Sequence, residues 1–527
     1  MAARRHRDNF AARAIGRWYD EAASARSIVL ALVLFVAAWT LFHAITLAPL
    51  GLHPDLTELY IWGQHPGAGY YKHPPLGALI CTLWFAVFPA ADWSFYLLGM
   101  LNSAVGLYFT WAIARRVLTG DKVLLSILFV LLTPFYQFFG LKFNANAILL
   151  STWPLATYCF LRAFETRAFS WSIAAGAAAA AALLGKYYSI YLVGSIVIAA
   201  LTHPDRARYL ASPSPWISSA TGLLLLVPHV RWLFANDFRP FAYAYAVHGN
   251  VGLGDVLLHT GSYLIGTIGY AALPVAVYVL AVRPDRKTLA KTLWPADPAR
   301  RMLVVLFAGF ILLPPLSAPF LGVELVALWT MSAWFLLPIV LLAPAPARFS
   351  RAAAVRFAGG LLAFTVIAVV AVAPVLAALN FRKPESDERG YLRPLAAAVT
   401  AAWHERVGRP LMFVAGEATL ATGVTFYSAD HPLAASDPDF SITPWVKPAR
   451  LAVEGFAGVC RAEDAGCIGW IAELSAAQSR AVRSQVRIVP RFAGYESAPA
   501  DFIIIIVPPR AFAQLAGLTL PSIQGPR

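Results

Sequence analysis

Charged residues are scarce in this chain. Asp, Glu, Lys and Arg make up 13% of its 527 residues, against roughly 25% in soluble proteins, whereas apolar residues make up 59%. This composition excludes an ordinary soluble protein and predicts a polytopic membrane protein. The charge that is present is basic, with a net value of +14. Because Lys and Arg gather in the cytoplasmic loops of membrane proteins, the excess does not indicate a nucleic-acid partner.

Cysteine is also rare, with four residues in the chain. Cys81 and Cys159 fall in apolar segments, where we interpret them as small buried hydrophobic residues. Cys460 and Cys467 bracket a short polar loop, and we favour a disulfide there, as is typical of an oxidising compartment. The alternative is a metal pair, but nearby His or Cys partners are missing. No carboxylate or His cluster has convincing metal spacing, so we predict no cofactor, while a role for a divalent metal stays open.

We expect no cleavable signal peptide, and the sequence shows no internal repeat. The first apolar segment, 27–50, is too long for a signal-peptide core and long enough to span a bilayer of about 30 Å. The Arg-rich residues 1–26 before it are expected to stay in the cytoplasm. Transporters of lipid-linked sugars often contain repeats, so their absence argues against that class.

About eleven segments are apolar over roughly 20 residues each and predict transmembrane helices. They fall near 27–49, 94–114, 123–140, 144–162, 171–185, 187–202, 216–235, 258–281, 302–320, 323–344 and 357–379.

The apolar segment 76–91 is shorter and follows two prolines, and we interpret it as re-entrant or interfacial. Counting it as a span would reverse every later loop and place most Lys and Arg outside, against the positive-inside rule. The favoured topology has a cytoplasmic N-terminus, a transmembrane domain over 27–380 and a large first outer loop over 50–93. Everything after residue 380 is then also outside.

Residues 381–527 differ from the rest because they are polar and broken by Pro and Gly. The runs 410–416 and 501–509 are typical of strands, and 471–484 has a helical pattern between them. We predict a small soluble α/β domain on the outer side.

Few charges fall in the predicted outer loops. Ionisable groups at membrane depth are costly and usually functional, so those present are informative. The basic residues are Lys72, His73, Lys142, Lys186 and Arg239. Lys binds phosphate as a point charge and His can donate a hydrogen bond, so this group predicts an anionic ligand at the membrane surface.

Two acids, Asp55 and Glu58, lie in the first outer loop. Their i, i+3 spacing would place them on one face of a short helix. Near phosphate-binding cations, an acid is better suited to accept a proton from an attacking hydroxyl group. Aromatic residues in the same loop suit either an interfacial belt or stacking on a sugar ring: Tyr60, Trp62, Tyr70 and Tyr71.

Each of these residues also has a simpler interpretation. Asp55 could be the N-cap of a helix that starts just after it, with Glu58 as its capping-box partner. The lysines could extend to lipid headgroups, and His73 before two prolines could be structural. The clustering favours a site, although no single residue decides.

The motif GYYKHPPL, 69–76, follows Asp55 by about 15 residues. This pattern resembles the GT-C glycosyltransferases, and more narrowly glycosyltransferase family 39, with the protein O-mannosyltransferases and the lipid A aminoarabinose transferase. The resemblance covers roughly 27–345. In KFNANAILLSTWPLA, Asn146 precedes Trp153 by seven residues, where the family has an Asp before the Trp.

The resemblance implies a GT-C fold of transmembrane helices and a polyprenyl-phosphate-sugar donor used on the non-cytoplasmic side. Asp55 would be the catalytic base, with Glu58 beside it. The segment LLGKYYS resembles the family's Lys-containing turn, so Lys186 would bind the donor phosphate with Lys72 and His73. By register, His73 takes the position of the family's phosphate-contacting Lys, and Lys72 replaces an acid.

We assign substrate contacts to Tyr71, Lys142, Asn146 and Arg239, and no residue to a metal. The predicted function is transfer of one sugar to an envelope acceptor, which is a lipid, a glycan or a protein, with inversion at the anomeric carbon. The composition favours a bacterium, so the site would lie on the periplasmic face of the inner membrane. The alternatives are a transporter or flippase of lipid-linked sugars and a ligase that uses a lipid-diphosphate donor.

Overall fold

The computed structural model describes residues 14–18, 20–21, 25–249, 252–344, 351–382, 388–436, 438, 440–476 and 480–509. Much of the predicted cytoplasmic segment 1–26 lies outside the described residues, as does the end of 381–527. The chain folds into two compact units. The first unit comprises 1–45, 66–84 and 93–374, and the second comprises 46–65, 85–92 and 375–527. The first outer loop is therefore divided between the two units.

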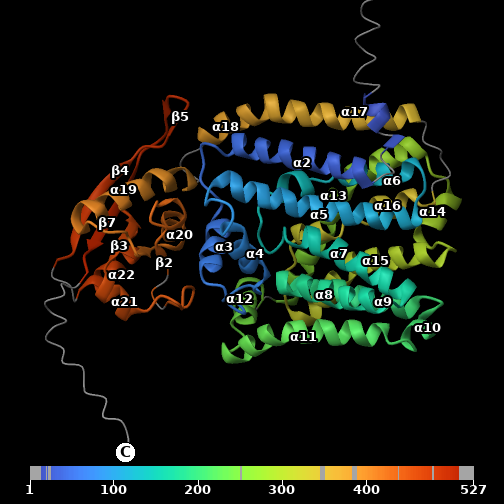
Figure 1. Cartoon of the computed structure of the whole chain (residues 1–527), viewed down its shortest axis with the longest axis horizontal. Coiled ribbons are helices and arrows are strands. Elements are labelled where there is room, and N and C mark those ends of the chain that lie inside the picture. The colour runs from blue at the N-terminus through green and yellow to red at the C-terminus, as the bar shows by residue number, and fades with distance from the viewer. Residues whose placement is uncertain are drawn as a thin grey trace, which may run out of the picture. The chain divides into compact units, whose positions relative to one another are not determined.

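The first unit is built from helices, which Figure 1 labels. They are α2 (Ala25–Thr46), α4 (Leu76–Phe85), α5 (Asp92–Val117), α6 (Asp121–Val130), η1 (Phe135–Phe139), α7 (Leu149–Thr166), α8 (Phe169–Gly185), η2 (Tyr187–Ser189), α9 (Ile190–Thr202), α10 (Arg206–Leu210), α11 (Ser214–Ala235), α12 (Arg239–His248), α13 (Leu253–Val282), α14 (Arg286–Leu293), α15 (Pro298–Leu321), η3 (Ala327–Ser332), α16 (Leu337–Leu342), α17 (Arg351–Ile367) and η4 (Ala368–Val372).

The second unit combines helices with strands. Its elements are α3 (Pro54–Gln64), α18 (Ala373–Phe381), α19 (Arg389–Val407), β1 (Phe413–Gly416), α20 (Ala418–Tyr427), β2 (Leu433–Ala435), α21 (Pro448–Glu454), β3 (Phe456–Arg461), α22 (Ala465–Ser475), β4 (Val482–Ile488), β5 (Arg491–Phe492), β6 (Tyr495–Glu496) and β7 (Ala500–Val507).

Six helices of the described residues are long and apolar enough to cross a membrane. They are Arg26–Thr46, Asp92–Val117, Ser214–Ala235, Leu253–Val282, Pro298–Leu321 and Arg351–Phe381. Large apolar side chains on them are strongly exposed, such as Leu224 at 71%, Ile265 at 74% and Leu280 at 76%. Surfaces of this kind require an apolar solvent, so the protein is a multi-pass membrane protein.

Two of the predicted spans are not continuous helices. The segment 123–140 ends its α-helix at Val130 and continues, after Pro134, as the short π-helical η1. The segment 323–344 is divided into the 3-10 helix η3 and the short α16. Proline explains much of this, because it interrupts a continuing helix but fits the first turn of a new one, as Pro338 does in α16. The count of eleven spans stays a prediction.

The helix α4 has 10 residues, which is about 15 Å of helix and half of a bilayer core. It is too short to cross the membrane, in keeping with the interfacial or re-entrant interpretation of 76–91. Helices α8 and α11 pack closely at Gly176, where an added Cβ would lie 2.2 Å from the Ser218 carbonyl oxygen. Small residues allow such close approach of helices within membranes.

A five-stranded sheet organises the second unit, with strand order β2-β1-β3-β7-β4. The first three strands run parallel, while β7 is antiparallel to both β3 and β4. Helices α19 and α20 pack on one face of the sheet, and α22 packs on the other, where Ile471 meets Gly458. The strand predictions at 410–416 and 501–509 are confirmed by β1 and β7. The helix prediction over 471–484 is wrong beyond Ser475, because β4 begins at Val482.

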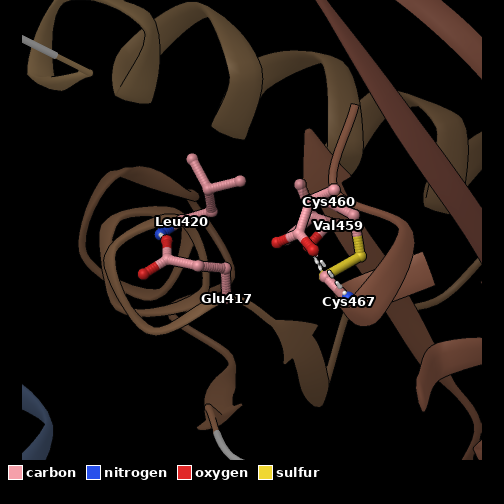
Figure 2. The surroundings of a disulfide bond; sticks show 6 residues. Glu417, Leu420, Val459, Cys460 and Cys467 are labelled. Atoms are coloured by element: carbon pink, nitrogen blue, oxygen red, sulfur yellow. Dashed lines mark hydrogen bonds between the residues drawn. A yellow bond between two sulfur atoms is a disulfide. The ribbon is translucent and has the colours of Figure 1, made fainter. Parts of the chain in front are cut away.

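Cys460 and Cys467 form a disulfide, shown in Figure 2, between the end of β3 and the first turn of α22. Asp464 caps that helix, since its carboxylate accepts a hydrogen bond from the Cys467 amide at 2.9 Å. Cys81 and Cys159 are buried free thiols.

Candidate functional site

Asp55 and Glu58 lie in the first two turns of α3, in the second unit. Leu56, Thr57 and residues 59–63 are buried, whereas the two acids are only partly buried. The expected short helix therefore exists, and it turns both carboxylates toward its less buried side. A negative charge in the first turn is also stabilised by the helix dipole.

The N-cap of α3 is His53, not Asp55. The Nδ1 atom of the His53 ring accepts a hydrogen bond from the Asp55 amide at 3.2 Å, and Pro54 occupies the first helical position. The alternative that Asp55 caps the helix is thus wrong. A capping box with Glu58 is wrong too, because its acidic residue stands three residues after the N-cap, and Glu58 is five residues after His53. Neither side chain is needed to start the helix.

The motif that contains Tyr71, Lys72 and His73 forms a tight turn in the first unit. The Tyr70 amide donates to the His73 carbonyl at 3.1 Å, and the hydroxyl group of the buried Tyr70 accepts a hydrogen bond from the Gly67 amide at 3.1 Å. Lys72 Nζ lies 5.6 Å from the centre of the Tyr71 ring and 6.0 Å from that of Tyr243 on α12. The cation is therefore held between two aromatic rings, a favourable arrangement for a partly desolvated ammonium group.

Lys186, between α8 and η2, meets Asn146 in the structure. Its Nζ donates a hydrogen bond to Asn146 Oδ1 at 2.5 Å. The same ammonium lies 4.5 Å from the centre of the Trp329 ring and 5.7 Å from that of Tyr188. Two predicted site residues that are 40 positions apart thus share one polar contact within an aromatic enclosure.

Asn146 is positioned by the turn that precedes α7. The Asn144 side chain accepts hydrogen bonds from the Asn146 and Ala147 amides at 3.0 and 3.1 Å. The Ala147 carbonyl then accepts from Asn102 on α5 at 2.7 Å. These bonds fix the backbone that presents Asn146 to Lys186.

His229 on α11 connects the motif turn to the Lys186 segment, and the sequence did not single it out. Its Nδ1 lies 2.6 Å from the Ala68 carbonyl oxygen and its Nε2 lies 2.9 Å from Tyr187 Oη. Because a carbonyl only accepts, Nδ1 carries the proton, and Nε2 accepts from the tyrosine hydroxyl. Gly69 beside it packs on Trp232, where a Cβ would lie 2.3 Å from the ring.

Trp329, which lies beside Lys186, also contacts the ring of His248, with ring centroids 5.0 Å apart. Burial lowers the pKa of His248, the Lys186 charge lowers it further, and Glu324 raises it. This imidazole is therefore neutral at pH 7 and adds no charge beside Lys186. Glu324 lies 3.1 Å from His259 Nε2 on α13.

The remaining predicted residues are less closely connected. Lys142 lies in the turn between η1 and α7. Arg239 is exposed at the start of α12, one helical turn before the Tyr243 ring that contacts Lys72. Among the described residues, no group of three or more His, Cys, Asp or Glu is arranged to hold a metal ion.

The sequence was compared with known proteins. Residues 72–232 match the family described as dolichyl-phosphate-mannose-protein mannosyltransferase. Two curated proteins of Rhizobium johnstonii are each 26% identical, the lipopolysaccharide core galacturonosyltransferases RgtB and RgtA. These alignments cover 72% and 74% of this chain and 78% of each relative.

The solved structure of ArnT from Cupriavidus metallidurans, bound to undecaprenyl phosphate, is similar to this structure. Its TM-score is 0.57 and its sequence identity 15%, over 96% of this chain and 100% of ArnT. Together these matches support a glycosyltransferase of the GT-C superfamily. The GT-C resemblance of the sequence is confirmed, and the transporter alternative is set aside because the protein is an enzyme.

We expect His229→Phe to slow this GT-C enzyme about tenfold while the protein still folds. The substitution keeps a ring of similar size but removes the hydrogen bonds to Ala68 and Tyr187, each worth roughly 0.5–1.5 kcal/mol. The motif turn would then be less well fixed. The initial rate of sugar transfer and the thermal midpoint of the purified protein would be measured together.

The matched control is Tyr187→Phe, which removes only one of the two hydrogen bonds. It should slow transfer less than His229→Phe does. Equal rates for wild type and His229→Phe would contradict a positioning role for this histidine.

Proposed function

We propose that this enzyme transfers a single sugar from a polyprenyl-phosphate-sugar donor to an envelope acceptor on the periplasmic face of the bacterial inner membrane. The observation that carries the proposal is the Lys186 ammonium, enclosed by Trp329 and Tyr188 and bonded to Asn146. The ammonium group is a point charge that suits the donor phosphate, and the aromatic rings around it suit stacking on the donor sugar.

The donor phosphate would contact Lys186, Lys72 and His73. As the bond between the anomeric carbon and the phosphate oxygen breaks, negative charge develops on the departing polyprenyl phosphate. Preorganised cations stabilise such charge, usually as one of the largest contributions to catalysis. The ArnT structure with undecaprenyl phosphate supports this choice of donor, because it joins the same fold to a lipid monophosphate.

Asp55 would act as the general base. Its carboxylate takes the proton of the acceptor hydroxyl while that oxygen attacks the anomeric carbon from the side opposite the phosphate. One bond forms as the other breaks, so the reaction inverts the anomeric centre. Base assistance is worth roughly 10²–10⁴-fold in rate. Glu58, on the same side of α3, would support Asp55 or hold the acceptor.

We further propose that the sugar is a hexuronate and that the acceptor is the core of lipopolysaccharide. The named function of both curated relatives supports this assignment. The contact between Lys186 and the neutral amide of Asn146 also fits it, because that contact does not offset the ammonium charge. Tyr71, Lys142 and Arg239 remain the proposed further contacts to the sugar or the acceptor.

The proposed orientation rests on the distribution of charge. Arg-rich loops would lie in the cytoplasm, and residues 381–527 would lie in the periplasm. The disulfide between Cys460 and Cys467 supports an oxidising location for 381–527.

The test is a comparison of envelope glycolipids by mass spectrometry in a gene-deletion strain and a strain complemented with the wild-type gene. We expect one hexuronate mass to disappear from the lipopolysaccharide core and to return on complementation. Loss of a different single sugar would overturn the hexuronate assignment. Loss of a whole oligosaccharide would instead favour the ligase that uses a lipid-diphosphate donor.

A further inference from the structure

The helix that carries Asp55 and Glu58 is held on its opposite side by the C-terminal residues of the same unit. Thr57 Oγ1 lies 2.9 Å from Thr422 Oγ1 of α20, and both side chains are buried. The ring of Tyr60 packs edge-on against Phe426, with centroids 5.0 Å apart. The buried side of α3 is thus packed on α20. The two helices are neighbours in Figure 1.

Backbone amides of the segment that leads into α3 donate hydrogen bonds to α20 and α19. The Leu52 amide donates to Tyr427 Oη at 2.7 Å, and the Gly51 amide donates to the Arg389 carbonyl at 2.9 Å. A Cβ on Gly51 would lie 2.7 Å from that carbonyl oxygen. The close approach therefore requires glycine and leaves the segment little freedom.

Tyr427 is itself held in place from two sides. Its hydroxyl group donates to Asp92 Oδ1 at 2.9 Å, while it accepts from the Leu52 amide. Arg393 pairs with the other Asp92 oxygen, donates to the Ala48 carbonyl at 2.8 Å, and lies 5.4 Å from the centre of the Tyr427 ring. One network of hydrogen bonds thus joins α19 and α20 to residues 46–65 and 85–92, the two parts of the first outer loop region that belong to this unit.

The far end of α3 is also attached. His65 stacks on Trp445 with ring centroids 5.0 Å apart, and the Gln64 side chain donates to the His431 carbonyl at 3.4 Å. The helix is therefore supported at its start, along its buried side and at its end. The two acids lie on its partly buried side.

We propose that Tyr427, with Arg393 and Thr422, is a positioning residue for the Asp55 carboxylate. The C-terminal fold then serves as the support of the catalytic helix. This inference rests on the proposed function, because the placement of α3 affects the rate only if Asp55 accepts the acceptor proton. Displacement of a reacting group by 1 Å can cost about 10²-fold in rate, so loss of a hydrogen bond at this support should be measurable.

The experiment compares Tyr427→Phe with Tyr391→Phe in the full-length protein. Both variants lose one tyrosine hydroxyl group from the same fold. Tyr391 donates instead to the Ala498 carbonyl, at 2.9 Å. Initial rates would be measured with a polyprenyl-phosphate hexuronate as donor and lipopolysaccharide from the deletion strain as acceptor. Thermal midpoints would be recorded for both.

We expect Tyr427→Phe to lower kcat about tenfold with little change in KM for the donor, and Tyr391→Phe to keep nearly the wild-type kcat. In the Asp55→Asn background, Tyr427→Phe should cause no further loss, because the base that it positions is gone. Equal kcat values for the two tyrosine variants would overturn the positioning role. A fully active Asp55→Asn would overturn the proposed base instead, which separates the two failures.

A second pair keeps the test independent of how well Tyr427→Phe folds. Thr422→Val removes the hydroxyl group that meets Thr57, and Thr422→Ser keeps it. We expect Thr422→Ser to retain most of the wild-type kcat and Thr422→Val to lose several-fold at a similar thermal midpoint. A double variant, Thr57→Cys with Thr422→Cys, would allow a disulfide to link α3 to α20. We expect the linked protein to remain active in transfer. Inactivation by this disulfide would show that α3 has to move away from α20, which would overturn the role of α20 as a fixed support.

Discussion

Asp55→Asn should reduce sugar transfer by about 10²–10⁴-fold, the range expected when a general base is removed. The amide matches the carboxylate in size but does not accept the acceptor proton at neutral pH. Because His53 and Pro54 begin α3 and Asp55 does not cap it, the helix should survive the change. The measurement is the initial transfer rate of full-length variants at equal expression, together with their thermal midpoints.

Glu58→Gln is the matched control for Asp55→Asn. It also neutralises one acid on the less buried side of α3, one turn further along the helix. We expect a loss several-fold smaller, because Asp55 remains. A larger loss for Glu58→Gln than for Asp55→Asn would exchange the roles of the two acids. Full activity of Asp55→Asn would remove Asp55 from the mechanism.

Local signals predicted several parts of this fold. The i, i+3 spacing of Asp55 and Glu58 predicted a short helix with both acids on one side, and α3 has this form. The apolar run in 501–509 predicted a buried strand, and β7 is that strand at the centre of an antiparallel pairing. Both features depend on residues that are neighbours in the sequence, where periodicity is a reliable guide.

The errors have physical causes that can be named. In 482–488, Val, Ser, Val and Ile alternate with Arg, Gln and Arg, which is the two-residue period of a strand. The helical pattern assigned to 471–484 overlooked this alternation. In 123–140, hydropathy alone predicted a span, but Pro134 stands before a changed helix type.

The contacts of the candidate site were beyond sequence patterns for a different reason. Lys186, Asn146 and Trp329 come from three separate segments, and only the tertiary fold brings them together. His229 and His248 likewise stand alone in or beside apolar segments, where an isolated histidine has no distinctive spacing. Sequence analysis could therefore propose the cations, but not the aromatic rings that enclose them.

Lys186→Met should reduce transfer by about 10²–10³-fold, the usual effect of removing one preorganised group that stabilises developing charge. Methionine keeps much of the apolar stem against Trp329 and Tyr188, so the aromatic enclosure should remain packed. What is lost is the ammonium group and its hydrogen bond to Asn146. Initial rates over a range of donor concentrations would separate kcat from KM.

Lys142→Met controls for general loss of positive charge at the membrane surface, because Lys142 is another lysine of the predicted outer loops, in the turn between η1 and α7. It should lower the rate of transfer less than tenfold.

If Lys186 acts mainly on the departing phosphate, Lys186→Met lowers kcat more than it raises KM, since the interaction strengthens as charge develops. A pure rise in KM would assign Lys186 to donor binding alone. Equal effects of the two lysine variants would contradict a specific role for Lys186, because a general surface potential does not distinguish between two lysines at the same interface.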